Sequence, residues 1–337
     1  MTAPIPDTDQ REPGPVEAWE FHRLARTSPR YRWWKPLLVA LVGAAFFVAM
    51  LLLTLAVAAL VGLFLPRLQG ATTAFFTDPT LDLNDPFTLA GALLAVIVLL
   101  PALLLATRLV GARPVGMLSS VVFRIRWGWL LRCLGFAAAI YVAGYLVTFA
   151  VAAVQGQSVA PQFDTPQALV VLALVMLLVP LQAATEEYLF RGYLMQSIGG
   201  WLRHPIFAIA LPIPLFVIGH DYGLLGTIYV AAFAAGAGWL CWRTGGLEAA
   251  IALHVVNNSV IFALGAIGLV DANSTDTGVL DLVISLAMML IFAAVVVRAA
   301  GLQNIVRTGT AVPGRAVAGS GIPDEPEQHD GHQLQHD

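Results

Sequence analysis

The feature that most constrains this chain is a series of long apolar stretches. Most of them approach the roughly 20 residues that a helix needs to cross the hydrocarbon core of a membrane. They run near Pro36–Leu65, Phe87–Thr107, Trp127–Val154, Gln167–Ala184, Pro205–Gly219, Gly226–Trp242, Leu247–Leu269 and Val279–Val297. Of the 337 residues, 58% are hydrophobic and 12% are charged, about half the charged fraction of an ordinary soluble domain. The sequence therefore predicts an all-α, polytopic membrane helix bundle of about eight transmembrane helices.

Two of these stretches depart from a simple span. Pro36–Leu65 is longer than a crossing requires, so this helix is expected to tilt or to extend beyond the bilayer. Pro205–Gly219 is short and contains Pro205, Pro212 and Pro214. Because proline removes a backbone donor and clashes with the preceding turn, we expect this segment to be bent and supported by its neighbours.

The distribution of Lys and Arg predicts the orientation of the spans. The basic segments are Arg23–Lys35, Arg108–Arg132, Arg191–Arg203, Arg243 and Arg298–Arg315. They alternate with connections that are nearly free of Lys and Arg, namely Thr72–Pro86, Gln155–Pro166 and Asp271–Asp276. The positive-inside rule then predicts a multi-pass protein of the cell (plasma) membrane with both termini in the cytoplasm.

Composition also suggests a division of the chain. We expect residues 1–35 to form a cytoplasmic segment with a basic and aromatic anchor, residues 36–165 to form the N-terminal transmembrane helices, and residues 301–337 to form a disordered cytoplasmic tail. No basic, aromatic-rich surface suggests a nucleic-acid partner. Cys133 and Cys241 lie inside apolar stretches and are interpreted as packing residues, not as a disulfide or a metal site.

The first polar motif in the apolar second half is Glu186-Glu187-Tyr-Leu-Phe-Arg191. An ionisable side chain away from the membrane interface is costly and is usually functional. Glu187 and Arg191 are four residues apart on a helix, so they share a face and can form an ion pair. Glu186 points about 100° away and is free to face a cavity. A charge cluster that ends the helix and stops transfer is the alternative interpretation.

Two further polar motifs follow. His220 comes after Phe216 at the end of the short proline-rich stretch, and His254 and Asn258 lie four residues apart in the seventh stretch. A structural histidine and an asparagine that joins helices would explain each motif singly. One polar cavity shared by Glu186, both histidines and Asn258 satisfies all of them at once.

In this order, the motifs E-E-x-x-x-R, F-x-x-x-H and H-x-x-x-N resemble the CPBP family of intramembrane proteases. A glycine-containing helix that ends in R-T-G-G-L separates the last two motifs, and the resemblance covers about Val170 to Val260. The family includes type II CAAX prenyl endopeptidases and bacterial relatives linked to bacteriocin self-immunity. The resemblance implies a CPBP-like catalytic transmembrane core over residues 166–300, with a cavity open towards membrane and cytosol.

The resemblance also implies roles for individual residues. Glu186 corresponds to the general base, His220 and His254 to its catalytic partners, and Asn258 to a fourth site residue. Glu187 and Arg191 correspond to the supporting part of the first motif.

The chemistry that fits these residues is hydrolysis of a peptide bond by an activated water. Glu186 would deprotonate the water, His254 or His220 would polarise the carbonyl, and Asn258 would donate a hydrogen bond. Glu186, His220 and His254 also make a plausible zinc set, so the sequence leaves open a metal-free and a metalloendopeptidase mechanism. We expect no firmly held cofactor, with zinc as the alternative. The expected partners are a membrane-associated protein or peptide substrate and the lipid bilayer.

The alternative function is a non-enzymatic membrane transporter or a bacteriocin-immunity-type binding protein. Proton-coupled carriers also place Glu and His in membranes. Against a carrier, the two halves of the chain contain no inverted repeat with matching broken helices.

A shared cavity also sets a geometric requirement. Glu186 is expected near the cytoplasmic end of its helix, whereas His220 ends the next span. The two meet only if Gly192–His204 lies at or within the membrane surface and the proline-rich helix is short and tilted.

Overall fold

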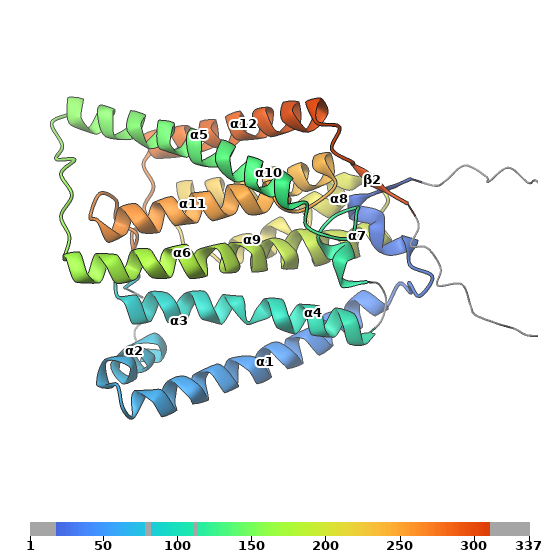
Figure 1. Ribbon diagram of the computed structural model, residues 1–337, viewed down its shortest axis with the longest axis horizontal. Helices are drawn as coiled ribbons and strands as arrows, with labels where there is room; N and C mark the ends of the chain where they lie inside the picture. Colours follow the sequence, from blue (N-terminus) through green and yellow to red (C-terminus); the bar gives the residue numbers. More distant parts are fainter. Residues whose placement is uncertain (1–17, 78–81, 111–113, 311–337) are drawn as a thin grey trace, which may run out of the picture.

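A computed structural model describes residues 18–77, 82–110 and 114–310. Long helices run roughly along the longest axis of the molecule (Figure 1). They are α1 Lys35–Gly62, α2 Pro66–Thr77, α3 Pro86–Ile97, α4 Leu99–Val110, α5 Trp127–Val154, α6 Thr165–Glu187, α7 Met195–Trp201, α8 Pro205–Ala210, α9 Ile213–Ile218, α10 Leu224–Thr244, α11 Glu248–Ala266 and α12 Val279–Leu302. The shorter elements are strand β1 Trp19–Glu20, the 3₁₀ segments η1 Phe21–Thr27 and η2 Val115–Leu118, the π-helical segment η3 Tyr188–Leu194, and strand β2 Thr308–Gly309.

The predicted polytopic membrane bundle of about eight helices is confirmed. Within the described ranges, 7 helical segments are long and apolar enough to cross a membrane, and Pro205–Ile218 is a shorter apolar segment. α1 is the most extreme, because none of its most apolar window is buried inside the protein. A helix whose apolar surface meets so little protein requires lipid around it.

Helix α2 was not expected. The sequence analysis placed its second half in the connection Thr72–Pro86, because Pro66–Thr77 mixes polar and apolar residues and has no long apolar run. Pro66 at the first helical position starts the helix without losing a hydrogen bond that would otherwise form. The span predicted at Phe87–Thr107 is also divided, into α3 and α4. Pro101 has no N–H to donate to Ile97, so the helix is interrupted at Val98.

Helix α6 continues further than expected. It passes through η3 into α7, so that helical structure is continuous over Thr165–Trp201. Arg191, which the sequence analysis counted as the start of the basic segment Arg191–Arg203, therefore lies within a helix and not in a connection. Its side chain is 4% exposed and lies inside the bundle, where an ion pair with Glu187 compensates its charge. The predicted bend in Pro205–Gly219 is confirmed, since α8 and α9 are separate helices that meet at Leu211 and Pro212.

The connections between helices gather at two opposite ends of the bundle (Figure 1). At one end, here called the loop end, residues 155–164, 219–223 and 267–278 lie together with the start of α3. Gln162 N–H donates to the Ile267 carbonyl (3.0 Å) and Gly223 N–H to the Thr275 carbonyl (2.9 Å). At the other end, here called the strand end, β1 and β2 lie beside the α10–α11 turn. The described parts of the predicted basic segments and of the connections predicted to be nearly free of Lys and Arg thus lie at opposite ends.

The strand end is more ordered than expected. β1 pairs antiparallel with β2, with Trp19 opposite Gly309, and η1 packs against α7 through the fully buried side chains of Phe21 and Leu24. The boundary of 301 for a disordered tail was therefore too early, because residues 301–302 belong to α12 and 308–309 to β2. The predicted disorder of residues 311–337 lies outside the described residues. In the predicted anchor, Trp33 and Trp34 are exposed, as an interfacial role requires.

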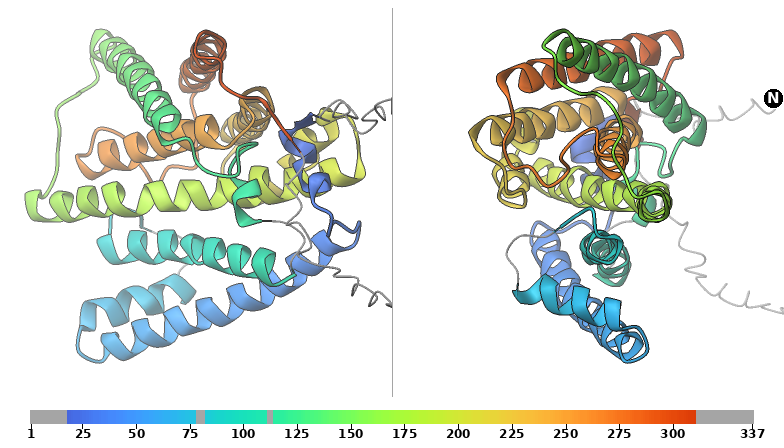
Figure 2. Two further views of the ribbon diagram at one scale, coloured as in Figure 1. Left: turned by 45° about the vertical axis from the view of Figure 1, so that its right-hand side comes forward. Right: turned by 90° about the vertical axis from the view of Figure 1, so that its left-hand side faces the viewer.

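Helix α11 lies at the centre of the bundle. It contacts α5, α6, α10 and α12, and the two views in Figure 2 show these helices around it, with α1, α2 and α4 set to one side behind α6. Ala249, Ala250, Ala252 and Leu253 are fully buried, and these mostly small side chains allow the neighbouring helices to approach closely. The polar residues that α11 carries are consequently held inside the protein.

Candidate active site

Glu187 receives two charged or polar partners in the core. Its Oε1 accepts a hydrogen bond from Arg191 Nη1 at 3.0 Å and lies 2.8 Å from His254 Nδ1. The Arg191 guanidinium also donates to the Ala234 carbonyl (3.1 Å) and lies over the Phe216 ring, 4.6 Å from its centroid. Glu187 has no exposed side-chain surface. The predicted Glu187–Arg191 ion pair is confirmed, and Glu187 additionally fixes the orientation of His254.

The local backbone places these groups. Helix α6 ends at Glu187 and continues as the π-helical segment η3, which contains Arg191. Such wider turns are uncommon and occur frequently at functional sites. Because the Glu187 carboxylate accepts at Nδ1, the proton of the neutral His254 ring resides on Nδ1, which leaves Nε2 to face the adjacent glutamate.

Glu186 lies on the other side of His254. Its Oε2 is 3.5 Å from His254 Nε2, and its Oε1 accepts a hydrogen bond from Gln182 Nε2 at 2.7 Å. The side chain remains 14% exposed, and Oε2 accepts no hydrogen bond from the described residues. A carboxylate with one oxygen held and the other unoccupied is suited to accept a proton.

A chain of hydrogen bonds leads to the held oxygen of Glu186. The hydroxyls of Tyr141 and Tyr229 donate to Asn257 Oδ1 at 3.1 and 2.8 Å. Asn257 Nδ2 donates to Asn258 Oδ1 (3.0 Å), and Asn258 Nδ2 donates to Gln182 Oε1 (3.2 Å). Every donor points towards Glu186, so the chain of hydrogen bonds ends on its carboxylate oxygen as the acceptor.

His220 reaches the same region from the loop that follows α9. Its Nδ1 lies 2.7 Å from the Phe216 carbonyl, so in the neutral ring Nδ1 donates and Nε2 is left as an acceptor. The Phe216 ring lies 4.7 Å from the His220 ring and 6.2 Å from the His254 ring, between centroids. The two histidines therefore lie on either side of one phenylalanine.

A cavity of about 580 Å³ connects these residues. His220, His254 and Asn258 line it, together with Gln182 and Asn257. Glu186 is not among the lining residues but contacts two of them, Gln182 and His254. At the mouth of the cavity, burial raises the pKa of Tyr222, and the nearby Glu186 carboxylate adds to this effect. The cavity extends from this region to Asp271, Ser274 and Asp276 at the loop end.

The zinc alternative requires Glu186, His220 and His254 to converge on one ion. The described residues contain no group of three His, Cys, Asp or Glu side chains placed to hold a metal ion. Both ring nitrogens of His254 face carboxylates, and Nδ1 of His220 faces a carbonyl. In each neutral ring Nε2 remains an acceptor, so the choice between a metal-free and a zinc mechanism stays a prediction.

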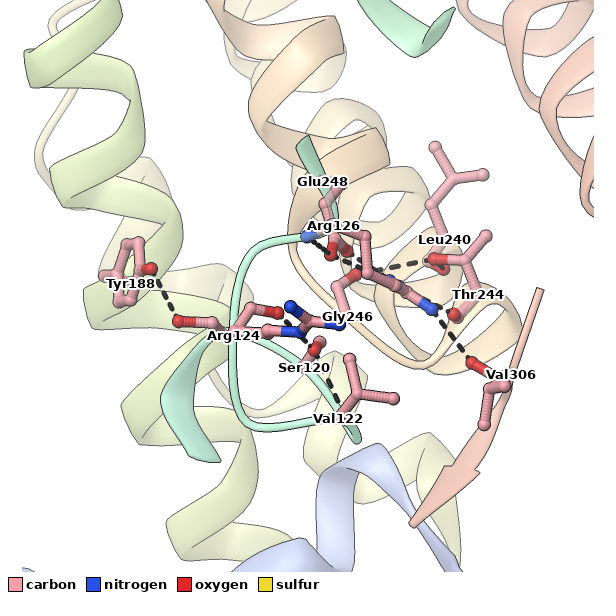
Figure 3. A network of polar contacts seen from close by, with 11 residues as sticks. Ser120, Val122, Arg124, Arg126, Tyr188, Leu240, Thr244, Gly246, Glu248 and Val306 are labelled. Atoms are coloured by element: carbon pink, nitrogen blue, oxygen red, sulfur yellow. Dashed lines mark hydrogen bonds and ion pairs between the residues drawn. The ribbon is translucent and has the colours of Figure 1, made fainter. Parts of the chain in front are cut away.

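A second polar network holds the first turn of α11 (Figure 3). Arg126 donates from Nε and Nη2 to the two carboxylate oxygens of Glu248, at 2.8 and 2.7 Å. The same guanidinium donates to the carbonyls of Thr244 (3.0 Å) and Val306 (2.9 Å). Gly245, at φ +70°, ends α10 in the left-handed conformation that glycine adopts without strain. This network joins the start of α11 to three other segments and so fixes the helix that carries His254 and Asn258.

Sequence reasoning brought together the right motifs but missed several members of the site. The sequence analysis did not propose Gln182, Asn257, Tyr141 or Tyr229 as site residues. Gln182 precedes Glu186 by four residues and shares its helical face, and Asn257 is adjacent to Asn258, so the spacing offered a signal for both. The two tyrosines carry no such signal, because they come from α5 and α10.

Comparison with known proteins identifies the segment that carries this site. Residues 165–260 match a family model described as type II CAAX prenyl endopeptidase Rce1-like. This segment, called the Rce1-like segment below, is similar to that family. It contains Glu186, His220, His254 and Asn258, and the resemblance recognised from the motifs is confirmed.

One curated relative matches beyond the Rce1-like segment. The chain is 26% identical over 204 residues to "Uncharacterized protein YyaK" of Bacillus subtilis (strain 168). This alignment covers 55% of this chain and 62% of that protein. The chain thus spans less than two thirds of the length of this relative. No solved structure matches the chain.

Proposed function

We propose that this protein is an intramembrane endopeptidase that hydrolyses a peptide bond of a membrane-associated protein or peptide with a water activated by Glu186. The observation that carries the proposal is the position of the Glu186 carboxylate. One of its oxygens is held by Gln182, and the other faces His254 Nε2 at 3.5 Å beside a cavity inside the bundle. The Rce1-like segment, which contains all of these groups, supports the same assignment.

The reaction proceeds by addition of water and expulsion of an amine. Glu186 accepts a proton from the water as its oxygen attacks the peptide carbonyl carbon, and a tetrahedral intermediate forms. When the carbon–nitrogen bond breaks, Glu186 returns this proton to the departing amine. The products are a carboxylic acid and an amine, and the carboxylate of Glu186 is regenerated.

Other residues assist through position and charge. Glu187 stabilises positive charge on His254, and the imidazolium can donate from Nε2 to the developing oxyanion. Asn258 has a second amide hydrogen beyond the one that it donates to Gln182, and it lies on the wall of the cavity. His220 presents Nε2 to the same cavity. These groups act in a site of low dielectric constant, where charge stabilisation is stronger than in water.

The test is cleavage by the purified full chain in a neutral detergent. Wild type and Glu186→Ala are incubated with a library of fluorescence-quenched peptides, and products are located by mass spectrometry. We expect wild type to cleave members of the library at internal bonds and Glu186→Ala to cleave none. Equal cleavage by both proteins would contradict the role of Glu186. Binding of peptides by both proteins without cleavage would favour the alternative of a non-enzymatic binding protein.

Metal removal tests the mechanism separately. Because the described residues contain no group of three His, Cys, Asp or Glu side chains placed to hold a metal ion, we expect activity to survive exhaustive chelation and the purified protein to contain well under one equivalent of zinc. Activity that chelation abolishes and added zinc restores would contradict the proposal, and would make those three residues ligands. The pH profile does not separate the two mechanisms, because both lose activity in acid.

A further inference from the structure

The cavity carries a charge pattern that the proposed catalytic chemistry does not use. Its lining includes Asp271, Asp276 and Asp281, and it includes no Lys or Arg. All three aspartates are exposed, and none forms an ion pair with another described residue. They come from the connection before α12 and from its first turn, so they surround the cavity where it opens at the loop end.

The other charged residues at the loop end are also mostly acidic. Asp82, Asp85, Asp164 and Asp221 lie in or beside its connections. Among the described residues of 63–85, 155–164, 219–223 and 267–278, Arg67 is the sole Lys or Arg. A cleft with walls of low dielectric constant concentrates the field of such charges and raises the local concentration of oppositely charged ligands.

The cavity itself is of a size and composition that suit a peptide. Its volume of about 580 Å³ lies within the range of ligand pockets. Its lining combines aromatic and aliphatic side chains, such as Phe149, Phe233 and Leu282, with the polar residues near Glu186. The passage from the three aspartates to His254 is therefore apolar along part of its length and acidic at its entrance.

We propose that the substrate is a peptide segment bearing Lys or Arg residues, which enters the cavity from the loop end past Asp271, Asp276 and Asp281. The cationic side chains remain at the acidic mouth while an apolar part of the segment extends towards Glu186 and His254. The three aspartates attract basic peptide segments and repel acidic ones, so the mouth of the cavity selects between the two kinds of segment. This inference rests on the proposed endopeptidase function for the identity of the ligand as a peptide.

Entry at this end has a consequence for the side of the membrane from which substrate comes. The loop end is opposite to the strand end, where the basic connections lie. With the predicted orientation, the substrate approaches from outside the cell. This differs from the opening towards the cytosol that the family resemblance implied.

The experiment measures binding independently of cleavage. The full-length Glu186→Ala chain, in a neutral maltoside detergent with a chelator, is titrated against two fluorescein-labelled peptides. The peptides share one apolar core of Leu, Val and Ala and differ in a tail of four Lys or four Glu. We expect the Lys peptide to bind about tenfold more tightly than the Glu peptide. Because the aspartates are exposed, the difference should shrink as salt is raised.

Matched variants assign the effect to the mouth. The triple variant Asp271→Asn, Asp276→Asn, Asp281→Asn should lose the preference, whereas Asp164→Asn should keep it. Asp164 is acidic, exposed and at the same end, but it does not line the cavity and makes no capping hydrogen bond. If the triple variant fails to fold, the inference is tested by the salt dependence of peptide binding to the Glu186→Ala chain, in which all three aspartates are kept. Equal affinity for the two peptides, no binding of either, or a preference insensitive to salt would overturn the inference.

Failure of the inference and failure of the proposed function give different results. If wild type cleaves peptides without regard to charge, the endopeptidase function stands and the inference is wrong. If charge-selective binding occurs but wild type cleaves no peptide, the inference stands and the proposed hydrolysis is wrong.

Discussion

Two adjacent glutamates of α6 have different surroundings, and the difference separates their roles. Glu187 is fully buried between Arg191 and His254, so it serves to compensate charge and to orient a ring. Each carboxylate has one oxygen that accepts no hydrogen bond from the described residues, but the side chain of Glu186 is 14% exposed whereas that of Glu187 is not exposed. A group that exchanges protons with substrate needs access, whereas a group that holds a neighbour does not.

Replacement of Arg191 by Ala tests this separation. It would leave the Glu187 carboxylate buried with His254 as its one remaining partner among the described residues. Loss of one member of a buried pair typically costs roughly 3–5 kcal/mol of folding free energy. We expect a clearly lower thermal midpoint in detergent and a lower yield of folded protein. The control is Arg203→Ala, whose side chain is exposed. Similar midpoints for the two variants would mean that the pair contributes little to stability.

At this scale the sequence predicted pairs within a helix better than contacts between helices. The four-residue spacing of Glu187 and Arg191 identified their ion pair, because helical geometry alone brings them together. The hydrogen bond from His254 to Glu187 depends on how α11 packs against α6, which no local spacing determines. Tyr141 and Tyr229 were missed for the same reason.

At the scale of single elements, the orientation of α11 depends on its first turn. Glu248 is fully buried and has all of its carboxylate directed to Arg126, which also binds the carbonyls that end α10 and precede β2. The helix therefore begins at a fixed point, and His254 follows less than two turns later. Precise placement of this helix is what brings His254 between two glutamates.

Replacement of Arg126 by Ala should release this anchor. The Glu248 carboxylate would stay buried without its cation, at a cost of about 3–5 kcal/mol. We expect a lower thermal midpoint and, in the protein that remains folded, slower peptide cleavage because His254 is less well positioned. Arg132→Ala is the matched control, since Arg132 lies near the start of α5 but is exposed and donates a hydrogen bond to the side chain of Gln303. Unchanged stability of Arg126→Ala would contradict the anchoring role.

Elements were predicted well where apolar length was sufficient evidence. α5, α10, α11 and α12 lie close to their expected bounds, since each is a single uninterrupted apolar run. Helix α2 was not predicted because its sequence mixes polar and apolar residues. The extension of α6 into η3 and α7 was not predicted, because Arg191 was counted as the start of a basic segment between helices. In the structure Glu187 compensates the charge of Arg191 inside the protein.

At the scale of the whole molecule, the alternation of basic and acidic connections corresponds to two ends of one bundle. Within the described ranges, the 7 long apolar helical segments together with the shorter segment Pro205–Ile218 give the even number of crossings that this separation requires. The sequence predicted this arrangement because the positive-inside rule relates Lys and Arg residues to one side of the membrane, whatever the packing of the helices. It predicted a polar cavity around the candidate site but not the extension of this cavity to the loop end, which depends on side chains of α3, α5, α11 and α12 that meet only in three dimensions.

Labelling of single cysteines in intact cells tests the orientation. Ala160→Cys lies at the loop end and Gln303→Cys at the strand end, and both positions are exposed. The native Cys133 and Cys241 are buried, so they contribute little background. With both termini in the cytoplasm, a membrane-impermeant maleimide should label Ala160→Cys in intact cells and Gln303→Cys only after lysis. The reverse pattern would invert the topology.

The central claim is that Glu186 activates water beside His254, and the most direct measurement is the cleavage rate of Glu186→Gln relative to wild type. Glutamine keeps the size of the side chain and the contact with Gln182 but removes the base. General base catalysis contributes about 10²- to 10⁴-fold. We predict a fall in the rate of at least about 10²-fold, with a thermal midpoint close to that of wild type. A folded Glu186→Gln protein that cleaves within about twofold of the wild-type rate would contradict the claim.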